Sequence, residues 1–239
     1  NERGIMLTNT PDVLTESTAD LGFALIMSSA RRVAELDAWT KAGQWQASVP
    51  SALFGCDVHG KTLGIVGLGN IGAAVARRGR LGFNMPILYS GNSRKTDLEH
   101  ELGAQYRSLE QLLAEADFVC LVVPLSEKTR HLIGQRELQL MKPSAILVNI
   151  SRGPVVDEAA LVHALQHGTI RGAGLDVYEK EPLSDSPLFQ LKNAVTLPHI
   201  GSATHETRDA MAQRALANLR SALLGERPQD LVNPQVFKG

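Results

Sequence analysis

The sequence predicts a doubly wound α/β fold, in which helices cover both faces of a parallel sheet. The first observation is a glycine-rich turn, Gly67-Leu68-Gly69-Asn70-Ile71-Gly72, which joins an apolar run at 62–66 to a helical pattern that begins at Ala73. The second is that further apolar runs alternate with helical patterns along the chain that follows. The third is that these runs are continuously apolar rather than alternating, which is typical of parallel strands buried on both faces.

The composition is that of an ordinary globular protein, because 44% of the 239 residues are hydrophobic and 21% are charged. This length suits one large domain or two small ones. The net charge of −1 gives no electrostatic case for nucleic acid or a membrane surface as a partner, and no apolar run reaches the ~18 residues of a membrane span. Cys56 and Cys120 lack the spacing of a metal site, so we expect no metal, no disulfide and a cytoplasmic location.

The segment before the glycine-rich turn predicts a loop, a helix and an irregular arm. Asn9-Thr10-Pro11 is typical of a loop, and Ser17-x-x-Asp20 resembles a capping box that opens a largely buried helix over 17 to about 36. The arm from Gly43 to Lys61 is punctuated by glycine and proline and carries the aromatic residues Trp45 and Phe54.

The alternating segments predict the sheet and the helices that cover it. Strands are expected at 62–66, 87–90, 104–106, 118–123, 145–150, 173–177 and 194–197. Helices are expected from 73 onward and near 97–102, 108–115, 135–141, 157–167 and 203–224. In such a sheet, ligands bind at the carboxyl ends of the strands.

The glycine-rich turn is typical of a dinucleotide-binding site. Gly67 permits the tight turn, Gly69 lets the backbone approach a pyrophosphate, and Gly72 lets the helix pack closely on the strand. The helix that follows directs its N-terminal amides and positive dipole end toward the phosphates, so Asn70 and Ile71 are also candidate cofactor contacts.

The end of the second strand indicates which nicotinamide cofactor binds. An acid there selects NAD by bonding the ribose 2′-hydroxyl, whereas basic residues accommodate the 2′-phosphate of NADP. Here Ser90 occupies the position of the acid, and Arg94 and Lys95 follow closely. A solvated surface turn is the alternative interpretation of this charged pair, but its position favours NADP(H) over NAD(H).

Three segments that follow strand ends carry the candidate catalytic groups. Arg152, after the 145–150 strand, can bind a carboxylate bidentately. His199, after the last strand, can donate a proton near neutral pH, and a neighbouring carboxylate would favour its protonated form and orient its ring. Taken singly, His199 and Glu181 could each be an ordinary loop residue.

Together the motifs VGLGNIG, NISRGPVVDEAAL, GLDVYEKEP and LPHIGSAT resemble the D-isomer-specific 2-hydroxyacid dehydrogenase family. Within it the chain is most similar to the NADPH-dependent glyoxylate/hydroxypyruvate reductases and to the 2-ketogluconate reductases. The resemblance runs from about residue 5 to 235 and includes TNTPDVLTESTADLGFAL and DLVNPQV. It implies reduction of a small 2-oxo acid to the D-2-hydroxy acid by a nicotinamide cofactor.

The resemblance also implies roles for individual residues. Arg152 would bind the substrate carboxylate, His199 would be the general acid, and Glu181, which directly precedes a proline, would pair with His199. Asp176 would hold the nicotinamide carboxamide. The other implied cofactor contacts are Val123, Pro124, Thr129, Ile150 and Gly201, together with Arg152 and His199 themselves.

Domain organisation and assembly are expectations from the same resemblance. The cofactor-binding Rossmann domain would span 9–203 and include a dimerisation helix and arm at 17–56. Segments 1–8 and 204–239 would be remnants of a second, flavodoxin-like substrate domain whose N-terminal part this chain lacks, so that the chain by itself binds only cofactor. The family implies a homodimer.

Two alternative functions are compatible with parts of this sequence pattern. A non-enzymatic, corepressor-like dinucleotide sensor shares this fold and these catalytic residues, but the chain shows no recruitment tail or basic patch. A phosphite or formate oxidiser would call for NAD and an acid at position 90. The choice among glyoxylate, hydroxypyruvate and 2-ketogluconate stays open.

Overall fold

The computed structural model describes residues 1–237, which form two compact units. The larger unit comprises 19–201, and the smaller unit comprises 1–18 and 202–237 of the described chain. The domain boundaries expected from the sequence, 9–203 against 1–8 and 204–239, remain a prediction.

The larger unit is built on a seven-stranded sheet in the order β3-β2-β1-β4-β5-β6-β7, with every pair parallel. The chain order reverses between β1 and β4, and a crevice for ligands forms at such a point in doubly wound sheets. The strands are β1 (Leu63–Val66), β2 (Ile87–Ser90), β3 (Gln105–Tyr106), β4 (Phe118–Leu121), β5 (Ile146–Asn149), β6 (Gly172–Leu175) and β7 (Ala194–Thr196). The predicted fold class is confirmed.

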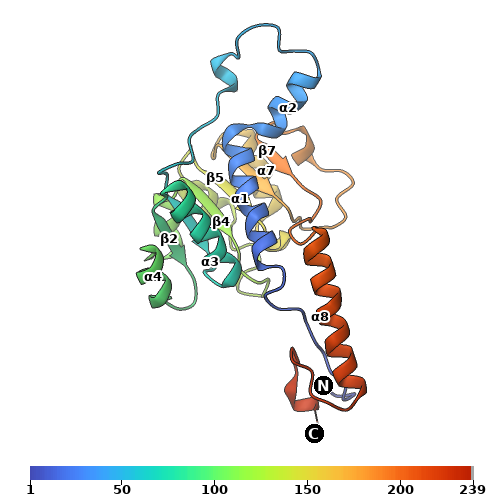
Figure 1. Ribbon diagram of the computed structural model, residues 1–239. Coiled ribbons are helices and arrows are strands. Elements are labelled where there is room, and N and C mark those ends of the chain that lie inside the picture. The colour runs from blue at the N-terminus through green and yellow to red at the C-terminus, as the bar shows by residue number, and fades with distance from the viewer. Residues whose placement is uncertain (238–239) are drawn as a thin grey trace. The chain divides into compact units, whose positions relative to one another are not determined.

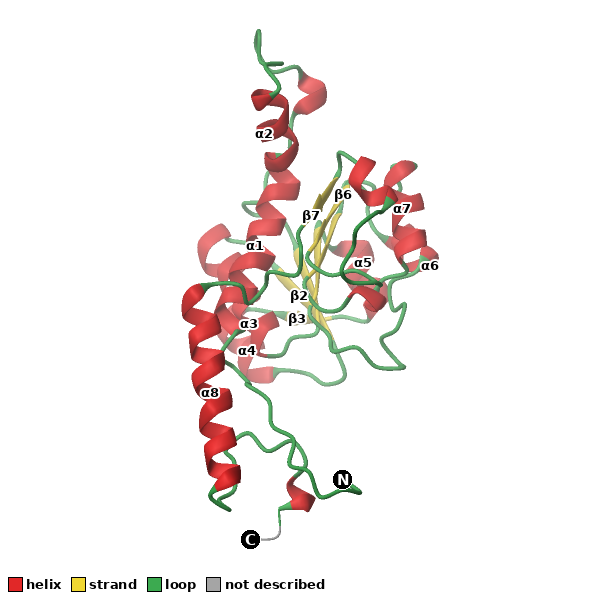
Figure 2. Cartoon of the chain, turned by 90° about the vertical axis from the view of Figure 1, so that its right-hand side faces the viewer, coloured by secondary structure: helices red, strands yellow, loops and turns green. Residues whose placement is uncertain are grey.

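Helices cover both faces of this sheet, as Figure 2 shows with the strands seen edge-on. On one face lie α1 (Thr15–Arg31), α3 (Asn70–Arg77) and α4 (Thr96–Leu102), and on the other lie α5 (Leu109–Glu115), α6 (Gln135–Leu140) and α7 (Glu158–Gln166). A short π-helix, Arg78–Gly82, extends α3. The core is correspondingly divided into two clusters, one on each face.

The central strands explain this division. All residues of β1, β4, β5 and β6 are buried, so successive side chains feed the two clusters in turn. Ile65 packs in the cluster under α1 and α3, for example, and Val66 packs in the cluster under α5. Burial on both faces is why these strands are continuously apolar in the sequence.

The helix predicted over 17–36 is two helices, α1 and α2 (Val33–Lys41), so this expectation was wrong in its extent (Figure 1). They are divided at Arg32, whose backbone is left-handed at φ 54°. The Arg32 side chain bonds Glu35 and the carbonyl of Ala52, and these contacts hold the break in place. The helix was expected to be largely buried, but α2 has no buried residue.

The capping box predicted at Ser17 and Asp20 does not form. The first helix begins earlier, at Thr15, and the Ser17 hydroxyl donates to the Leu14 carbonyl at 3.2 Å. Asp20 instead binds Arg78 at 2.6 Å. A serine and an acid at the spacing of a cap can thus serve other partners inside a helix.

The smaller unit contains α8 (His205–Leu223) and the segments around it. Thr204 caps this helix by accepting from the amide of Thr207 at 3.1 Å. Asp230 binds Arg214 through both carboxylate oxygens, at 2.5 and 2.8 Å, and accepts from the side chain of Asn218. The tail is therefore fixed to α8 by charge and hydrogen bonds.

Candidate active site

The glycine-rich turn has the geometry that a bound dinucleotide needs. Gly67 has φ 100°, which favours glycine, and a Cβ on Gly72 would lie 2.2 Å from the Gly67 carbonyl oxygen. A Cβ on the exposed Gly69 would meet no atom within 4 Å. The first and third glycines are thus required by the turn itself, whereas the second leaves an open surface that a pyrophosphate can approach.

The start of α3 lies directly behind this surface. Gly69 is its N-cap and contributes no side chain, and the Gly69 carbonyl accepts from the Ala73 amide at 2.8 Å. Asn70 and Ile71 form the first turn, where amide groups and the positive end of the helix dipole favour an anion. Asn70 and Ile71 as contacts of a bound cofactor remain a prediction.

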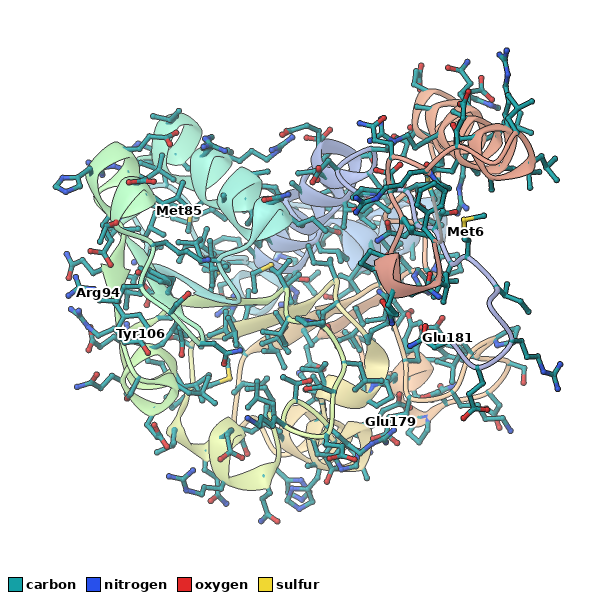
Figure 3. All side chains as sticks on the ribbon, turned by 90° about the horizontal axis from the view of Figure 1, so that it is seen from below. Met6, Met85, Arg94, Tyr106, Glu179 and Glu181 are labelled. Atoms are coloured by element: carbon teal, nitrogen blue, oxygen red, sulfur yellow. The ribbon has the colours of Figure 1, made fainter. Side chains whose placement is uncertain are left out.

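The end of β2 joins the same region, since the Gly67 amide donates to the Ser90 carbonyl at 2.8 Å. Ser90, and not an acidic residue, is the last residue of this strand. Arg94 lies near Tyr106 in Figure 3 and is exposed, and its guanidinium binds both carboxylate oxygens of Glu99, at 2.7 and 3.0 Å. The Lys95 amide donates to the Tyr89 hydroxyl at 2.7 Å.

The loop after β4 supplies the other predicted wall of the cofactor site. Val123 adjoins the turn, because a Cβ on Gly67 would lie 2.8 Å from its side chain. The hydroxyl of Thr129 donates to the Pro124 carbonyl at 2.6 Å and accepts from the Ser126 amide at 2.8 Å. Thr129 therefore folds this loop back on itself beside the strand end.

Arg152 follows β5 and is positioned by a polar residue that the sequence reasoning missed. Asn149, fully buried at the end of the strand, accepts from the amide and hydroxyl of Ser151 and donates to the Arg152 carbonyl at 3.1 Å. The Arg152 side chain is exposed, and the preceding Ile150 is buried. A polar residue at the end of an otherwise apolar strand was the available signal.

His199 and Glu181 form a direct pair, with Nδ1 of the ring 2.6 Å from the carboxylate Oε2. The other carboxylate oxygen accepts from the Tyr178 amide at 2.9 Å. Burial raises the pKa of Glu181, but hydrogen bonds from His199 and Tyr178, with the charges of His199 and Arg152, outweigh it and leave that pKa lowered. The carboxylate is therefore ionised near neutral pH and is bonded to His199, its predicted partner.

Asp176 fixes the turn that carries the histidine. Its two buried oxygens accept from the amides of Ile200 and Gly201, at 2.7 and 2.9 Å, and His199 itself has a left-handed backbone at φ 54°. Burial, the largest influence, raises the pKa of Asp176 against the opposing effect of these two amides. Each carboxylate oxygen has a further lone pair, so the group can accept another hydrogen bond.

Glu179, the other acid of this loop, has a different partner. It lies 2.6 Å from Nε2 of His131, and Glu179 and Glu158 each accept from the other's amide. Glu179 and Glu181 come from the same loop in Figure 3. The structure thus brings Glu181, the acid directly before the proline, to His199.

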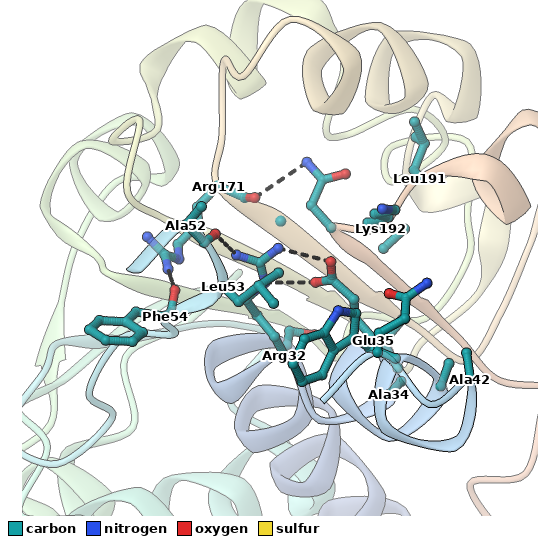
Figure 4. A pocket seen from close by; sticks show the side chains of 18 of the residues that line it. Arg32, Ala34, Glu35, Ala42, Ala52, Leu53, Phe54, Arg171, Leu191 and Lys192 are labelled. Atoms are coloured by element: carbon teal, nitrogen blue, oxygen red, sulfur yellow. Dashed lines mark hydrogen bonds and ion pairs between the residues drawn. The ribbon is translucent and has the colours of Figure 1, made fainter. Parts of the chain in front are cut away.

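The larger unit has one cavity at these catalytic loops and another at the amino ends of β6 and β7. One, of about 430 Å³, is lined by Glu181, His199 and apolar residues that include Leu183 and Phe189. The other, of about 940 Å³, lies between α2, the arm and β7, where Arg32 bonds Glu35 and Arg171 donates to the Phe54 carbonyl (Figure 4). The smaller cavity is the one that contains the candidate acid.

Within residues 1–237, no cluster of three or more histidine, cysteine, aspartate or glutamate side chains is arranged to hold a metal ion. Over the same described range, every helix is too short or too polar to cross a membrane.

Comparison with known proteins identifies the family. Residues 23–201 match the family model described as D-isomer specific 2-hydroxyacid dehydrogenase, NAD binding domain. The chain is 56% identical to glyoxylate/hydroxypyruvate reductase B of Pectobacterium carotovorum over all 239 residues, which cover 75% of that protein. It is 55% identical to the reductase of the same name from Yersinia pestis, covering 99% of this chain and 73% of that protein.

Solved structures agree with these sequence matches. A protein from Thermus thermophilus superposes with a TM-score of 0.91 at 48% identity, covering 97% of this chain and 72% of that one. An NADPH-dependent glyoxylate/hydroxypyruvate reductase from Sinorhizobium meliloti, in complex with NADP and malonate, gives a TM-score of 0.90 at 36% identity, covering 100% and 73%. The chain belongs to the D-isomer-specific 2-hydroxyacid dehydrogenase family.

Proposed function

We propose that this protein reduces a small 2-oxo acid with NADPH, with glyoxylate, hydroxypyruvate and 2-ketogluconate as the candidate substrates. The observation that carries the proposal is the grouping of the His199–Glu181 pair with the charge of Arg152 at the carboxyl ends of the sheet. The relatives named glyoxylate/hydroxypyruvate reductase B support the first two substrates. The third rests on the sequence resemblance.

Arg152 would bind the carboxylate of the substrate. Its planar guanidinium can donate two parallel hydrogen bonds, which fixes the acid in one orientation. The bonds around Asn149 hold the Arg152 backbone, and the guanidinium donates to the Ser151 carbonyl at 2.7 Å, so part of its freedom is already lost before a substrate binds. A bound nicotinamide supplies the hydride for the carbonyl carbon.

His199 would protonate the carbonyl oxygen during reduction and remove that proton during oxidation. Glu181 occupies Nδ1, which leaves Nε2 as the nitrogen that faces a substrate. The ionised carboxylate would balance positive charge on the ring during the reaction, and its contact with Nδ1 sets the orientation of the ring. Asp176 would position the His199 turn and would also accept from the nicotinamide carboxamide.

NADP(H) is the proposed cofactor in preference to NAD(H). Ser90 would leave room for a 2′-phosphate, and Arg94 and Lys95 would supply its positive charges. The open side of Gly69 and the first turn of α3 suit the pyrophosphate, and Val123, Pro124, Thr129, Ile150 and Gly201 complete the proposed contacts. The solved relative in complex with NADP supports this choice.

The test follows absorbance at 340 nm with NADPH or NADH and each candidate acid. Because the chain covers 75% of the Pectobacterium relative, we would assay it beside a chain extended to the full length of that relative. Turnover with NADPH that is lost in H199Q and R152Q supports the proposal. Tight NADPH binding without turnover in either chain would overturn it and favour a dinucleotide sensor.

We also propose that the protein works as a cytoplasmic homodimer that uses the segment 17–56. Helix α2 has no buried residue, and Trp45 and Phe54 on the arm are 64% and 60% exposed. Large exposed aromatic side chains are typical of interface cores. Light scattering after gel filtration tests the dimer, and W45S should shift it toward monomer.

The cytoplasmic location is proposed from Cys56 and Cys120, which are free thiols and suit a reducing compartment.

A further inference from the structure

The two cations at the end of β2 share one anchor, the hydroxyl of Tyr89. This tyrosine is fully buried in β2, and its hydroxyl donates to Glu99 Oε1 at 2.5 Å and accepts from the Lys95 amide at 2.7 Å. Glu99 then accepts from Nε and Nη2 of Arg94, at 3.0 and 2.7 Å. Lys95 is therefore tied to the sheet through its backbone, and Arg94 is tied to it through Glu99.

The exposure of these groups shows which of them is fixed. The side chain of Glu99 is 16% exposed, whereas that of Arg94 is 66% exposed. The pKa of Glu99 is lowered, first by the hydrogen bonds from Arg94 and then by the one from Tyr89, so the carboxylate is ionised. Glu99 is thus an immobilised anion that holds an otherwise solvated guanidinium in a defined place.

From this geometry we propose that Tyr89 and Glu99 are positioning residues that set the selectivity for NADPH over NADH. The inference rests on the proposed function, in which Arg94 and Lys95 receive the 2′-phosphate. Arg94 uses two of its five donors on Glu99 and retains three for a ligand. A long side chain that is already held loses less conformational freedom when it binds.

Glu99 also carries a negative charge that repels a phosphate, so two effects oppose each other. The bound Arg94 guanidinium offsets much of that charge, and salt screens interactions at the exposed guanidinium. The loss of rotamer freedom, by contrast, is not screened, and the 91–93 bend that precedes Arg94 supplies no regular structure to restrain it. Positioning therefore outweighs repulsion.

The experiment measures the dissociation constants of NADPH and NADH for the full chain, by cofactor fluorescence, in wild type and variants. E99Q and Y89F should weaken NADPH binding by roughly three- to tenfold and leave NADH binding within about twofold. The matched control is E101Q, which removes a carboxylate from the same helix, where it pairs with Arg77 instead. Neither constant should change in E101Q.

R94Q separates this inference from the proposal on which it rests. If R94Q weakens NADPH binding but E99Q and Y89F leave it unchanged or make it tighter, the positioning role is wrong and the cofactor choice survives. If wild type binds NADPH no better than NADH, or R94Q has no effect, the proposed cofactor choice fails and the inference falls with it. Equal losses for NADPH and NADH in E99Q would indicate a merely structural role and also overturn it.

Discussion

At the scale of single residues, three glycines of one turn serve two physical purposes. Gly67 and Gly72 are required by the protein's own backbone, because Gly67 has a positive φ and a Cβ on Gly72 would lie 2.2 Å from the Gly67 carbonyl oxygen. Gly69 has ordinary extended dihedral angles and open space beside it, so nothing in the protein itself demands a glycine there. A requirement for glycine at that position would come from a ligand.

Alanine substitutions should separate these purposes. We expect G72A to lower the free energy of unfolding by about 1–3 kcal/mol, because the helix must move away from the turn. G69A should cost less than about 1 kcal/mol, the difference between the two residues as helix caps, yet weaken NADPH binding roughly tenfold or more. Urea denaturation and cofactor titration measure the two effects. Equal stability losses with unchanged affinity would contradict this assignment.

The His199–Glu181 pair leads to a prediction about pH. Because the pKa of Glu181 is lowered, its carboxylate stays ionised down to pH values below the ordinary 4.5, so Glu181 should add no titration to the rate of reduction between pH 5 and 7. E181Q should lower kcat roughly tenfold or more by removing the charge that stabilises the protonated ring. E179Q, which alters the pair with His131, is the control. An E181Q rate equal to wild type would refute the role of the pair.

The sequence predicted which residues would gather at the site better than it predicted how they are held. The motif favours Glu181 over Glu179, and in the structure Glu181 lies against His199. The hydrogen bonds of Asn149 and Glu99 were not foreseen, because each joins residues through a loop or helix conformation that short sequence patterns do not encode.

At the scale of elements, strand positions were predictable because burial on both faces leaves a continuous apolar run. The break between α1 and α2 was not predictable in the same way. Arg32 is an ordinary helix former, and its left-handed conformation depends on Glu35 and on the distant Ala52. Tertiary contacts therefore overrode local preference at that point.

Asp117 joins three elements and should contribute to stability in a pH-dependent way. It accepts from the Thr62 amide before β1 and from Lys142 after α6, each at 2.9 Å. Burial raises its pKa, but these bonds outweigh burial and leave the pKa below the ordinary 3.8. A lowered pKa means that the stabilisation is complete well above pH 3.8 and is lost as the pH falls through the folded-state value.

D117N should therefore lower the free energy of unfolding by about 1 kcal/mol at pH 7. The difference from wild type should shrink as the pH is lowered toward 3, because wild type then loses the same charge. Urea denaturation across this range measures it, and D185N, which changes an exposed aspartate, should match wild type throughout. A gap that widened at low pH would contradict the expected sign.

At the scale of the whole molecule, the predicted fold class was correct because its signals are repeated along the chain. Seven strands, each followed by a turn or a helix, limit the possible arrangements far more than any one motif does. The boundary between the two units at 18 and 19 was harder to predict from the sequence, because α1 continues across it as one helix.

The two thiols should report on opening of the larger unit. Cys120 lies in β4 at the centre of the sheet, fully buried, and burial raises its pKa to about 12. Cys56 is partly buried, and its pKa is raised by burial against the opposing charge of Arg171. Because the thiolate is the reactive form, a disulfide reagent at pH 8 should modify Cys56 slowly and Cys120 only when the sheet opens.

NADPH should then protect Cys120 more than Cys56. A ligand at about 100 times its dissociation constant stabilises the folded state by about 2.7 kcal/mol, which would slow labelling through global opening roughly a hundredfold. C56S isolates the Cys120 signal, and unfolding in urea should restore rapid reaction of both thiols. If Cys120 reacted as fast as Cys56 in the native protein, or without protection by NADPH, then the central strands would open independently of the cofactor site, and sheet and site would not form one cooperative unit.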